Sequence, residues 1–310
     1  MSLLSTPEPA ALEAPPPEGH EPTDWSRVER CTYVIRQRLR YEYPVPISSL
    51  RQQLIIVPPA RHGDQRRAGW SVEVSQPVRR HDRRDRFGNW IIDLEVDGVD
   101  AAIDFDACIA IERHATPYPH RVAIDRTFAQ PTRLTTPDAT LTRAAGQLRR
   151  RASSGVALAE RICEWVHNQF EYGDGVTAVD TTAAEALREG VGVCQDYAHV
   201  MLTVCREAGL PARYISGHLV GEGGSHAWVE VLLPDGEGGP GPRGWVALAL
   251  DPTHNRATGM SYVTIATGCD YEDVAPTSGT YLSTRSGSLH ARKHMGLASV
   301  EYQPSQPYAS

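Results

Sequence analysis

The hydrophobic period of the chain changes once, and that change divides the sequence into two parts. From about residue 31 to residue 113, β-forming residues alternate or cluster between Pro, Gly and Asn, as in CTYVIRQRLRYEYPVP and FGNWIIDLEV. A period of two is typical of strands. After a Pro- and Thr-rich connector that runs to about residue 137, the period moves toward 3.6, the period of a helix. We therefore predict an all-β N-terminal domain, built as a small sandwich, followed by a domain that contains helices.

The two ends of the chain show neither period. Residues 1–25 are rich in Pro and Glu and lack the basic start and apolar core of a secretory signal, so they predict a disordered tail. Residues 286–310 are rich in Ser, Gly and Pro, and we expect this tail to be partly disordered as well. These limits place the β domain at 26–130 and the second domain at 131–285.

Charge and composition exclude several classes of function. A formal net charge of −7 provides no overall basic field, which argues against nucleic acid or an anionic membrane as a partner. No apolar run approaches the ~20 residues that a membrane-spanning helix requires. The Arg-rich run RRHDRRDRFGN, residues 79–89, falls at a predicted hairpin tip, where a solvated turn is favoured over a binding patch. The 6 cysteines form no CxxC pair, so reduced thiols and a cytoplasmic location are expected.

Two helices precede the most informative segment. The stretch VALAERICEWVHNQFEY has apolar residues at helical spacing on one face, which predicts that they are buried: Leu158, Ile162, Trp165 and Val166. Thr182 and Glu185 have the spacing of a capping box, so a short helix is expected to begin there and to stop at Gly190.

The segment GVGVCQDYAHVMLTVC, residues 190–205, places Cys194 in the first turn of a third helix. Its apolar stripe continues through Ala198, Leu202 and Cys205, so the helix is predicted to be largely buried. A thiol is a useful nucleophile only as a thiolate, and a free cysteine with a pKa of about 8.5 is mostly protonated at neutral pH. A helix N-terminus favours the anion, and its free N–H groups can stabilise an oxyanion.

Three strands follow this helix, in ARYISGHLVG, SHAWVEVLLP and GWVALALDP. His226 begins the second strand after a glycine loop, and Asp251 ends the third. If these two strands pair as a hairpin, the start of one lies beside the end of the other, and the carboxylate can orient the imidazole. Taken singly, Cys194 and His226 are more often structural than catalytic residues, and Asp251 before Pro252 is a common start of a turn. Together, the ordered series Cys194, His226, Asp251 predicts a catalytic triad.

A zinc site is the competing interpretation of these residues. It would draw on Cys194, His199, His218, His226 and His254. Structural zinc sites use ligand pairs two to four residues apart on turns, and the chain has neither such a pair nor an HExxH helix. We therefore expect no metal and no cofactor, and we assign no chemistry to the other cysteines.

The residues around the predicted triad match a known family. GVGVCQDYAHVMLTVCREAGLPARYISGHL, SHAWVEVLLP and GWVALALDPTHN resemble the catalytic core of the bacterial transglutaminase-like superfamily, whose members are papain-like thiol enzymes. YEYPVPISSLRQQLIIVPP resembles the N-terminal β-region of that group, and GCDYEDVAPTSGTY resembles the block that follows its core. The resemblance spans roughly Tyr33 to Tyr281.

This resemblance implies an α+β fold, in which an N-terminal β-sandwich-like domain precedes a papain-like core with the nucleophile helix packed on an antiparallel sheet. It implies a triad of Cys194, His226 and Asp251 that attacks amide or peptide carbonyls of a peptide or protein substrate and forms a thioester. Hydrolysis by a cysteine peptidase or amidase is the favoured outcome. Transfer to an amine, as in a transglutaminase, is one alternative, and a non-catalytic scaffold of the same fold is another.

The sequence departs from the family pattern at two places. Cys269 stands where an arginine is expected, which removes any salt bridge made from that position. The loop Pro234–Gly244 is longer than the family minimum, so it can cover or reshape the cleft. The second oxyanion donor stays open between Trp165, Tyr172 and Gln195.

Overall fold

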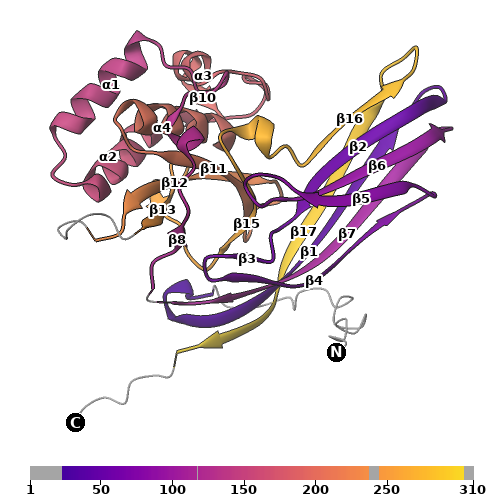
Figure 1. The fold of residues 1–310 in the computed structure, drawn as a ribbon, viewed down its shortest axis with the longest axis horizontal. Coiled ribbons are helices and arrows are strands. Elements are labelled where there is room, and N and C mark those ends of the chain that lie inside the picture. The colour runs from indigo at the N-terminus through magenta and orange to yellow at the C-terminus, as the bar shows by residue number, and fades with distance from the viewer. Residues whose placement is uncertain (1–22, 117, 237–243, 304–310) are drawn as a thin grey trace.

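The computed structural model describes residues 23–116, 118–236 and 244–303. A β-sandwich lies beside a core in which helices cover one sheet (Figure 1). The sandwich strands are β1 (Val28–Glu42), β2 (Ile47–Val57), β3 (Arg61–His62), β4 (Gln65–Val74), β5 (Arg79–Arg84), β6 (Trp90–Val99), β7 (Ala102–His114), β16 (Thr277–Leu282) and β17 (Ser288–Tyr302). The helices are α1 (Ala139–Arg150), α2 (Gly155–His167), α3 (Ala183–Glu189) and α4 (Cys194–Glu207).

The other strands belong to the core: β8 (Arg121–Val122), β9 (Glu171–Tyr172), β10 (Val191–Gly192), β11 (Ala212–Leu219), β12 (His226–Pro234), β13 (Trp245–Asp251), β14 (Arg256–Ala257) and β15 (Tyr262–Gly268). Three short 3₁₀ segments, Trp25–Arg27, Arg126–Ala129 and Tyr271–Asp273, complete the elements. No helix in the described part of the chain is long and apolar enough to cross a membrane.

The predicted sandwich is confirmed. Its two sheets have the strand orders β17-β1-β7-β4-β3 and β16-β2-β6-β5. Alternating residues of both sheets meet between them and form one apolar cluster, which includes Leu39, Leu54, Ile92, Leu94 and Phe105. This is the arrangement that a period of two produces when one face of each strand is buried.

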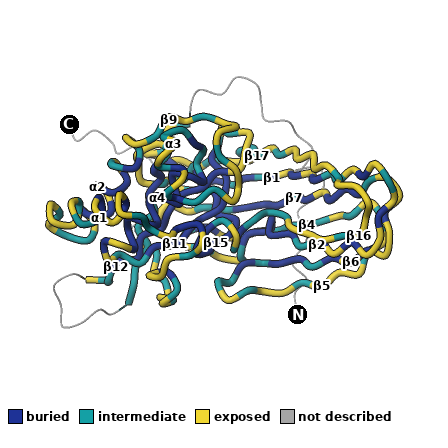
Figure 2. Tube along the Cα trace, turned by 90° about the horizontal axis from the view of Figure 1, so that it is seen from above, coloured by how far each residue is buried: buried dark blue, intermediate teal, exposed yellow. Residues whose placement is uncertain are grey.

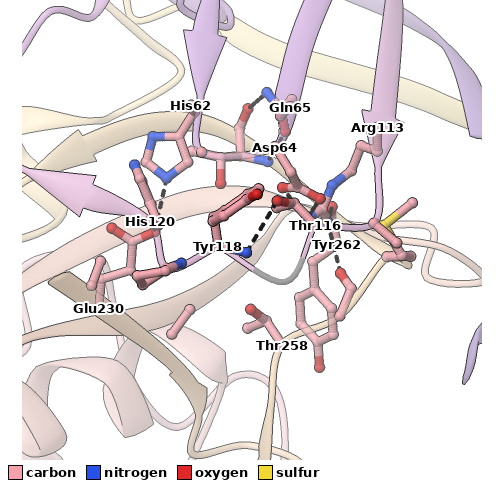
Figure 3. Close-up of a pocket in the computed structure, with 18 of the residues that line it drawn as sticks. His62, Asp64, Gln65, Arg113, Thr116, Tyr118, His120, Glu230, Thr258 and Tyr262 are labelled. Carbon is pink, nitrogen blue, oxygen red and sulfur yellow. Dashed lines mark hydrogen bonds and ion pairs between the residues drawn. The ribbon is translucent and has the colours of Figure 1, made fainter. Parts of the chain in front are cut away.

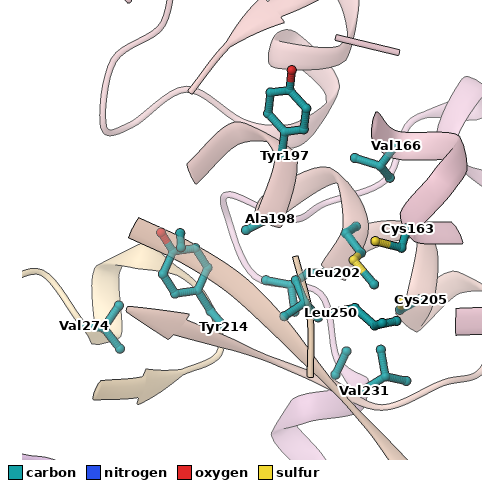
Figure 4. Packing of buried hydrophobic residues seen from close by; sticks show 14 of the residues in the cluster. Cys163, Val166, Tyr197, Ala198, Leu202, Cys205, Tyr214, Val231, Leu250 and Val274 are labelled. Carbon is teal, nitrogen blue, oxygen red and sulfur yellow. The ribbon is translucent and has the colours of Figure 1, made fainter. Parts of the chain in front are cut away.

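The core is an antiparallel sheet, in the order β14-β13-β12-β11-β15, with α4 packed on one face. Almost every residue of α4 is buried, and its apolar side chains contact residues of β11, β12 and β13 (Figure 4). Figure 2 shows this helix and sheet as the most buried part of the molecule. The predicted α+β class is confirmed, as is the helix that begins at Cys194.

The helix boundaries follow the local signals closely. Thr182 and Glu185 form the predicted capping box of α3, and Gly190 ends that helix in the left-handed conformation with φ 67°. On α2, the predicted face is buried except for Trp165, which is half-buried and packs against the same core. Trp165 therefore belongs to the core packing, as expected.

The predicted C-terminal tail is wrong for residues 288–302. This segment is the long strand β17, which pairs with β1 over its whole length, from Ser288 opposite Glu42 to Tyr302 opposite Val28. As an edge strand with much of its surface in solvent, it needs no strict apolar alternation. Its stability comes from pairing with a strand more than 200 residues away, which a local pattern does not reveal.

Two boundaries and one hairpin also differ from expectation. Within the predicted β domain, β8 pairs with β13 of the core, and within the predicted second domain, β16 pairs with β2 of the sandwich. The Arg-rich run forms the edge strand β5 and only then the turn at residues 85–89. Charged side chains are a common means of protecting an exposed edge. The N-terminal tail up to residue 22 and the loop residues 237–243 lie outside the described residues.

Side-chain amides join the sandwich to the core along β15. Gln65 donates to the Thr264 carbonyl at 2.8 Å and accepts from its N–H at 2.9 Å. Asn89 makes the same pair of bonds with Thr267, at 2.7 and 2.8 Å. Each amide thus takes the place of a neighbouring strand residue, and the two domains are held at a fixed orientation.

Candidate active site

The start of α4 is built around Asp196. Its Oδ2 accepts hydrogen bonds from the Val193 N–H at 2.8 Å and the Thr177 hydroxyl at 2.7 Å. Gly192 is required here, since an added Cβ would lie only 2.6 Å from that carboxylate oxygen. The N–H groups of Cys194 and Gln195, at the first two helical positions, have no intrahelical acceptor. They are therefore available to an anion beside the thiol.

His226 lies where the hairpin prediction placed it. β12 and β13 pair in antiparallel fashion, with Val229 opposite Leu250, so the start of β12 is next to the end of β13. His226 Nε2 is 2.8 Å from Asp251 Oδ2, and both side chains are buried. The Cys194 sulfur lies 3.9 Å from the carbonyl oxygen of Ser225, the residue before His226. The structure thus brings the three predicted triad residues together.

Asp251 is the centre of a dense hydrogen-bond network. Its Oδ2 also accepts from the Tyr262 hydroxyl at 2.7 Å and contacts His254 Nδ1 at 2.8 Å, while Oδ1 accepts from the Thr253 N–H at 2.9 Å. Burial alone would raise its pKa, but the bonds from His226, Tyr262 and His254 hold that pKa well below its usual range. Asp251 is therefore a carboxylate at any physiological pH.

His226 is a cation at neutral pH. Burial opposes the charge, but the hydrogen bond to Asp251 and the interaction with Cys194 raise the pKa of His226 to about 10. A buried imidazolium favours a negative charge on a neighbouring sulfur, since opposite charges stabilise each other strongly away from bulk water. The site therefore holds His226 as an imidazolium, bonded to the Asp251 carboxylate and next to the Cys194 sulfur.

Glu222 is a further polar residue of the site, and it was not predicted from the sequence. Its Oε2 lies 3.2 Å from His226 Nδ1 and its Oε1 lies 3.3 Å from His254 Nε2. The residue belongs to the glycine-rich turn GEGGS between β11 and β12, where it is the only carboxylate. The turn was visible in the sequence, but not the direction in which its one acidic side chain points.

Lys293, the only lysine of the chain, was missed for a different reason: it comes from β17, which was expected to be disordered. Its ammonium group contacts the Gly224 carbonyl oxygen and lies 2.7 Å from His218 Nδ1. Burial lowers the pKa of Lys293 to about 8, against the opposing effects of Glu222 and Cys194. The C-terminal strand therefore supports the loop that precedes His226.

The three candidates for the second oxyanion donor differ in their contacts. Gln195 donates its side-chain N–H to the Val179 carbonyl at 3.0 Å, so it is already bonded. Trp165 packs against the core. Partial desolvation and the nearby Cys194 raise the pKa of Tyr172, which lies on β9 directly beside β10 and the start of α4. Of the three, Tyr172 is the one whose hydroxyl interacts electrostatically with Cys194.

The residues of the alternative zinc site do not form one cluster. His226 and His254 share Asp251, whereas His199 accepts from the Tyr271 N–H at 3.2 Å inside the core. Burial lowers the pKa of His199 to about 3, so it is neutral. His218 contacts Lys293 instead.

Cys269, which stands where the family pattern has an arginine, is buried. Its carbonyl oxygen accepts a 2.6 Å hydrogen bond from Arg206, a buried arginine of α4. Arg206 donates also to the Phe128 and Ala212 carbonyl oxygens. These contacts hold the chain after β15 against the C-terminal end of α4, opposite the end that carries Cys194.

Comparisons with known proteins agree with this architecture. Residues 142–250 match the family model of the transglutaminase-like superfamily, and residues 33–112 match that of the bacterial transglutaminase-like N-terminal region. The solved structure of a proposed cysteine protease from Cytophaga hutchinsonii superposes with a TM-score of 0.72 over 90% of this chain and 94% of that chain. At 20% identity, this likeness establishes the fold.

Two curated relatives share part of the sequence. An uncharacterized protein of Mycobacterium leprae is 37% identical over 127 residues, which are 38% of this chain and 42% of that protein. An uncharacterized protein of Mycobacterium bovis is 33% identical over 145 residues, 43% of this chain and 45% of that protein. The matched part of the chain thus spans less than half the length of these relatives.

Proposed function

The chain belongs to the transglutaminase-like superfamily, and we propose that it is a thiol hydrolase that cleaves peptide or isopeptide-like amide bonds through Cys194, His226 and Asp251. The observation that carries the proposal is the position of His226. It is bonded to a buried carboxylate on one nitrogen and lies beside a thiol at a helix N-terminus on the other side. This is the geometry that nucleophilic catalysis by cysteine requires.

In the first step, the Cys194 thiolate attacks the carbonyl carbon of the substrate amide, and the carbonyl π electrons move to oxygen. The N–H groups at the start of α4, those of Cys194 and Gln195, stabilise this oxyanion, and we assign the additional side-chain donor to the Tyr172 hydroxyl. The hydrogen bond to the buried Asp251 carboxylate keeps the imidazolium of His226 oriented during the attack.

In the second step, the oxyanion collapses, the C–N bond breaks, and His226 Nδ1 gives its proton to the leaving nitrogen. The products are a free amine and a thioester on Cys194. Neutral His226 then takes a proton from water, the resulting hydroxide attacks the thioester, and the acid and the thiol are released. Glu222 contacts the same Nδ1 atom, so its side chain must move aside when substrate enters.

Amine transfer is the second candidate, since the thioester also reacts with a primary amine. The two fates differ in whether water or an amine reaches the acyl carbon. Incubation of the protein with a glutamine peptide and a labelled amine distinguishes them. Peptide cleavage without amine incorporation supports the hydrolase, and incorporation without cleavage overturns it.

Cys194→Ala is the catalytic control for this experiment, and Cys108→Ser is its match. Cys108 is a half-buried thiol on β7, and its replacement should leave turnover unchanged. If a broad substrate screen finds no turnover, and if Cys194 alkylates only above pH 8 with no effect of His226→Ala, the chain is the non-catalytic scaffold. Any turnover that survives Cys194→Ala also contradicts the proposal.

A further inference from the structure

A second polar site lies on the same core sheet, on the face opposite α4. By strand alternation, Ala227 and Val229 of β12 point into the apolar core under α4, whereas Trp228 and Glu230 point the other way. A cavity of about 500 Å³ opens on that second face, between the core sheet and the sandwich. Figure 3 shows its polar lining, which includes His62, Gln65, Arg113, Tyr118, His120 and Glu230.

Three potential metal ligands converge at one end of this cavity. His62 Nε2 is 2.8 Å from Glu230 Oε1, and His120 Nδ1 is 3.7 Å from the same oxygen. The two imidazole rings are 4.6 Å apart at an angle of 72°, and the three ligand atoms all lie within 4.8 Å of one another. The side chains come from three segments that are far apart in the sequence, and Figure 3 shows them pointing toward one another.

The two histidines are held by their backbones. His62 is the last residue of β3 before the two-residue turn to Gln65, whose amide is bonded to β15. Gly63 in that turn has φ +55°, and an added Cβ would lie 3.2 Å from the His120 ring. His120 leads into β8, and its carbonyl oxygen accepts from the Ala247 N–H at 2.9 Å. Neither imidazole therefore depends on a flexible loop for its position.

Glu230 is held from the opposite side. It lies across from Arg213 in the β11–β12 pairing, and the Arg213 guanidinium bonds Oε2 through Nε at 2.7 Å and Nη2 at 2.5 Å. Oε1 is thereby left to face the two histidines. A ligating carboxylate whose other oxygen is fixed by an outer hydrogen bond is the usual arrangement in protein metal sites.

The protonation states suit a cation. Burial lowers the pKa of His62, and an imidazole nitrogen is a common metal ligand. Burial opposes ionisation of Glu230, but Arg213 and His62 keep its pKa well below the usual range. Two imidazoles and one carboxylate are a ligand set that suits zinc and similar divalent transition metals.

We propose that His62 Nε2, His120 Nδ1 and Glu230 Oε1 bind one divalent transition-metal ion, best suited to Zn²⁺, with its fourth coordination position open to the cavity. This site uses none of the residues of the triad or of the zinc interpretation considered from the sequence. The ion would join the β3–β4 turn, the segment before β8 and β12, and so link the sandwich to the core. A water or an acidic group of a ligand would complete its coordination from the cavity.

The test is a titration of the chelator-treated full chain with ZnCl₂ by calorimetry, and with CoCl₂ followed by visible absorption. We expect one equivalent of Zn²⁺ to bind, a tetrahedral Co²⁺ spectrum, and an increase in the thermal midpoint on adding zinc. His120→Asn should weaken zinc binding by at least 10–100-fold, since loss of even an outer partner of a metal ligand has that effect. His62→Asn should do the same.

Cys194→Ala and His254→Asn are the controls for metal binding at the thiol and at the Asp251 cluster. Both should keep the one-equivalent zinc isotherm. The thermal midpoint of metal-free His120→Asn tests whether this variant is folded, and we expect little change because the His120 side chain is partly exposed. The proposal is overturned if zinc at 100 times the protein concentration does not bind. It is also overturned if binding survives His120→Asn or is lost in Cys194→Ala.

Discussion

β12 carries two histidine–carboxylate clusters on one face, and they differ in which partner holds the charge. His226 and Glu230 are four residues apart on this strand, on the order of 13 Å, with Trp228 between them. In the first cluster a histidine lies between the carboxylates of Asp251 and Glu222. Burial opposes the charge of this histidine, but the hydrogen bond to Asp251 and the interaction with Cys194 raise the pKa of His226 to about 10.

In the second cluster the carboxylate of Glu230 lies between an arginine and two histidines. Arg213 already compensates the negative charge, so burial decides the state of His62, and its pKa is lowered. The same residue types around the same strand thus give a histidine with a raised pKa in one place and a histidine with a lowered pKa in the other. The balance of carboxylates and arginines around a buried imidazole thus determines the direction in which its pKa shifts.

The largest expected effect comes from removing the carboxylate that makes the first cluster different. Asp251→Asn should lower kcat/KM by roughly 10³–10⁴-fold, by analogy with the loss of the orienting aspartate in other triads. The pKa of His226 should fall, because its main stabilising partner is neutral. The measurement is kcat/KM against pH on a cleaved peptide. A loss smaller than tenfold would show that Asp251 does not orient the imidazole.

Arg213→Met should make the second cluster resemble the first. Without the guanidinium, Glu230 is a buried carboxylate whose remaining partners are histidines, so His62 should take up a proton near neutral pH. Breaking a buried ion pair costs about 3–5 kcal/mol, which denaturant unfolding would measure. Arg79→Met, on the exposed edge strand β5, is the matched control and should change stability little. An equal effect of the two variants would contradict the comparison.

The two histidines should affect stability at opposite ends of the pH range. The pKa of His226 is raised from 6.5 to about 10, so its contribution is fully present below pH 6.5 and is lost as pH rises through 10. The pKa of His62 is lowered, so its contribution is present above pH 6.5 and is lost as pH falls. The free energy of unfolding of His226→Gln should therefore approach that of the wild type at high pH. The free energy of unfolding of His62→Gln should approach that of the wild type at low pH. The exposed His81→Gln gives the baseline, and parallel curves for both variants would refute this account.

The smallest effect is expected from Glu222→Gln, which removes one of the two carboxylates beside His226. Glu222 is half-buried, so solvent weakens its influence, and a change of a few-fold in kcat/KM is expected. The alkaline limb of the pH profile should move to lower pH, since the imidazolium loses a neighbouring negative charge. An unchanged limb would show that Glu222 does not act on His226.

The local signals of the sequence predicted most of the core. The capping box at Thr182, the thiol at the start of α4 and the hairpin of β12 and β13 each depend on residues close together in the chain, and each is present. Whether Cys194, His226 and Asp251 act as a triad stays a prediction, although they lie together.

The local sequence pattern did not predict the contacts between segments that are distant in the chain. β17 was taken for a tail because its edge position requires no apolar alternation, and Lys293 was missed with it. His62, His120 and Glu230 meet only because a hairpin turn, a connector and a strand converge in space. No spacing rule relates residues that are 58 and 110 positions apart.

Because β1 pairs with β17, this sheet of the sandwich cannot be completed until residues 288–302 have been synthesised. A ribosome releases β1 among the first structured residues, yet the strand that covers its outer edge appears only when residues 288–302 emerge. Until then the nascent chain presents an open strand edge, the kind of surface on which unfinished chains associate with one another. The helical core has already left the exit tunnel by that time, so it can fold first and shield β1 from one side while the last strand is still being made.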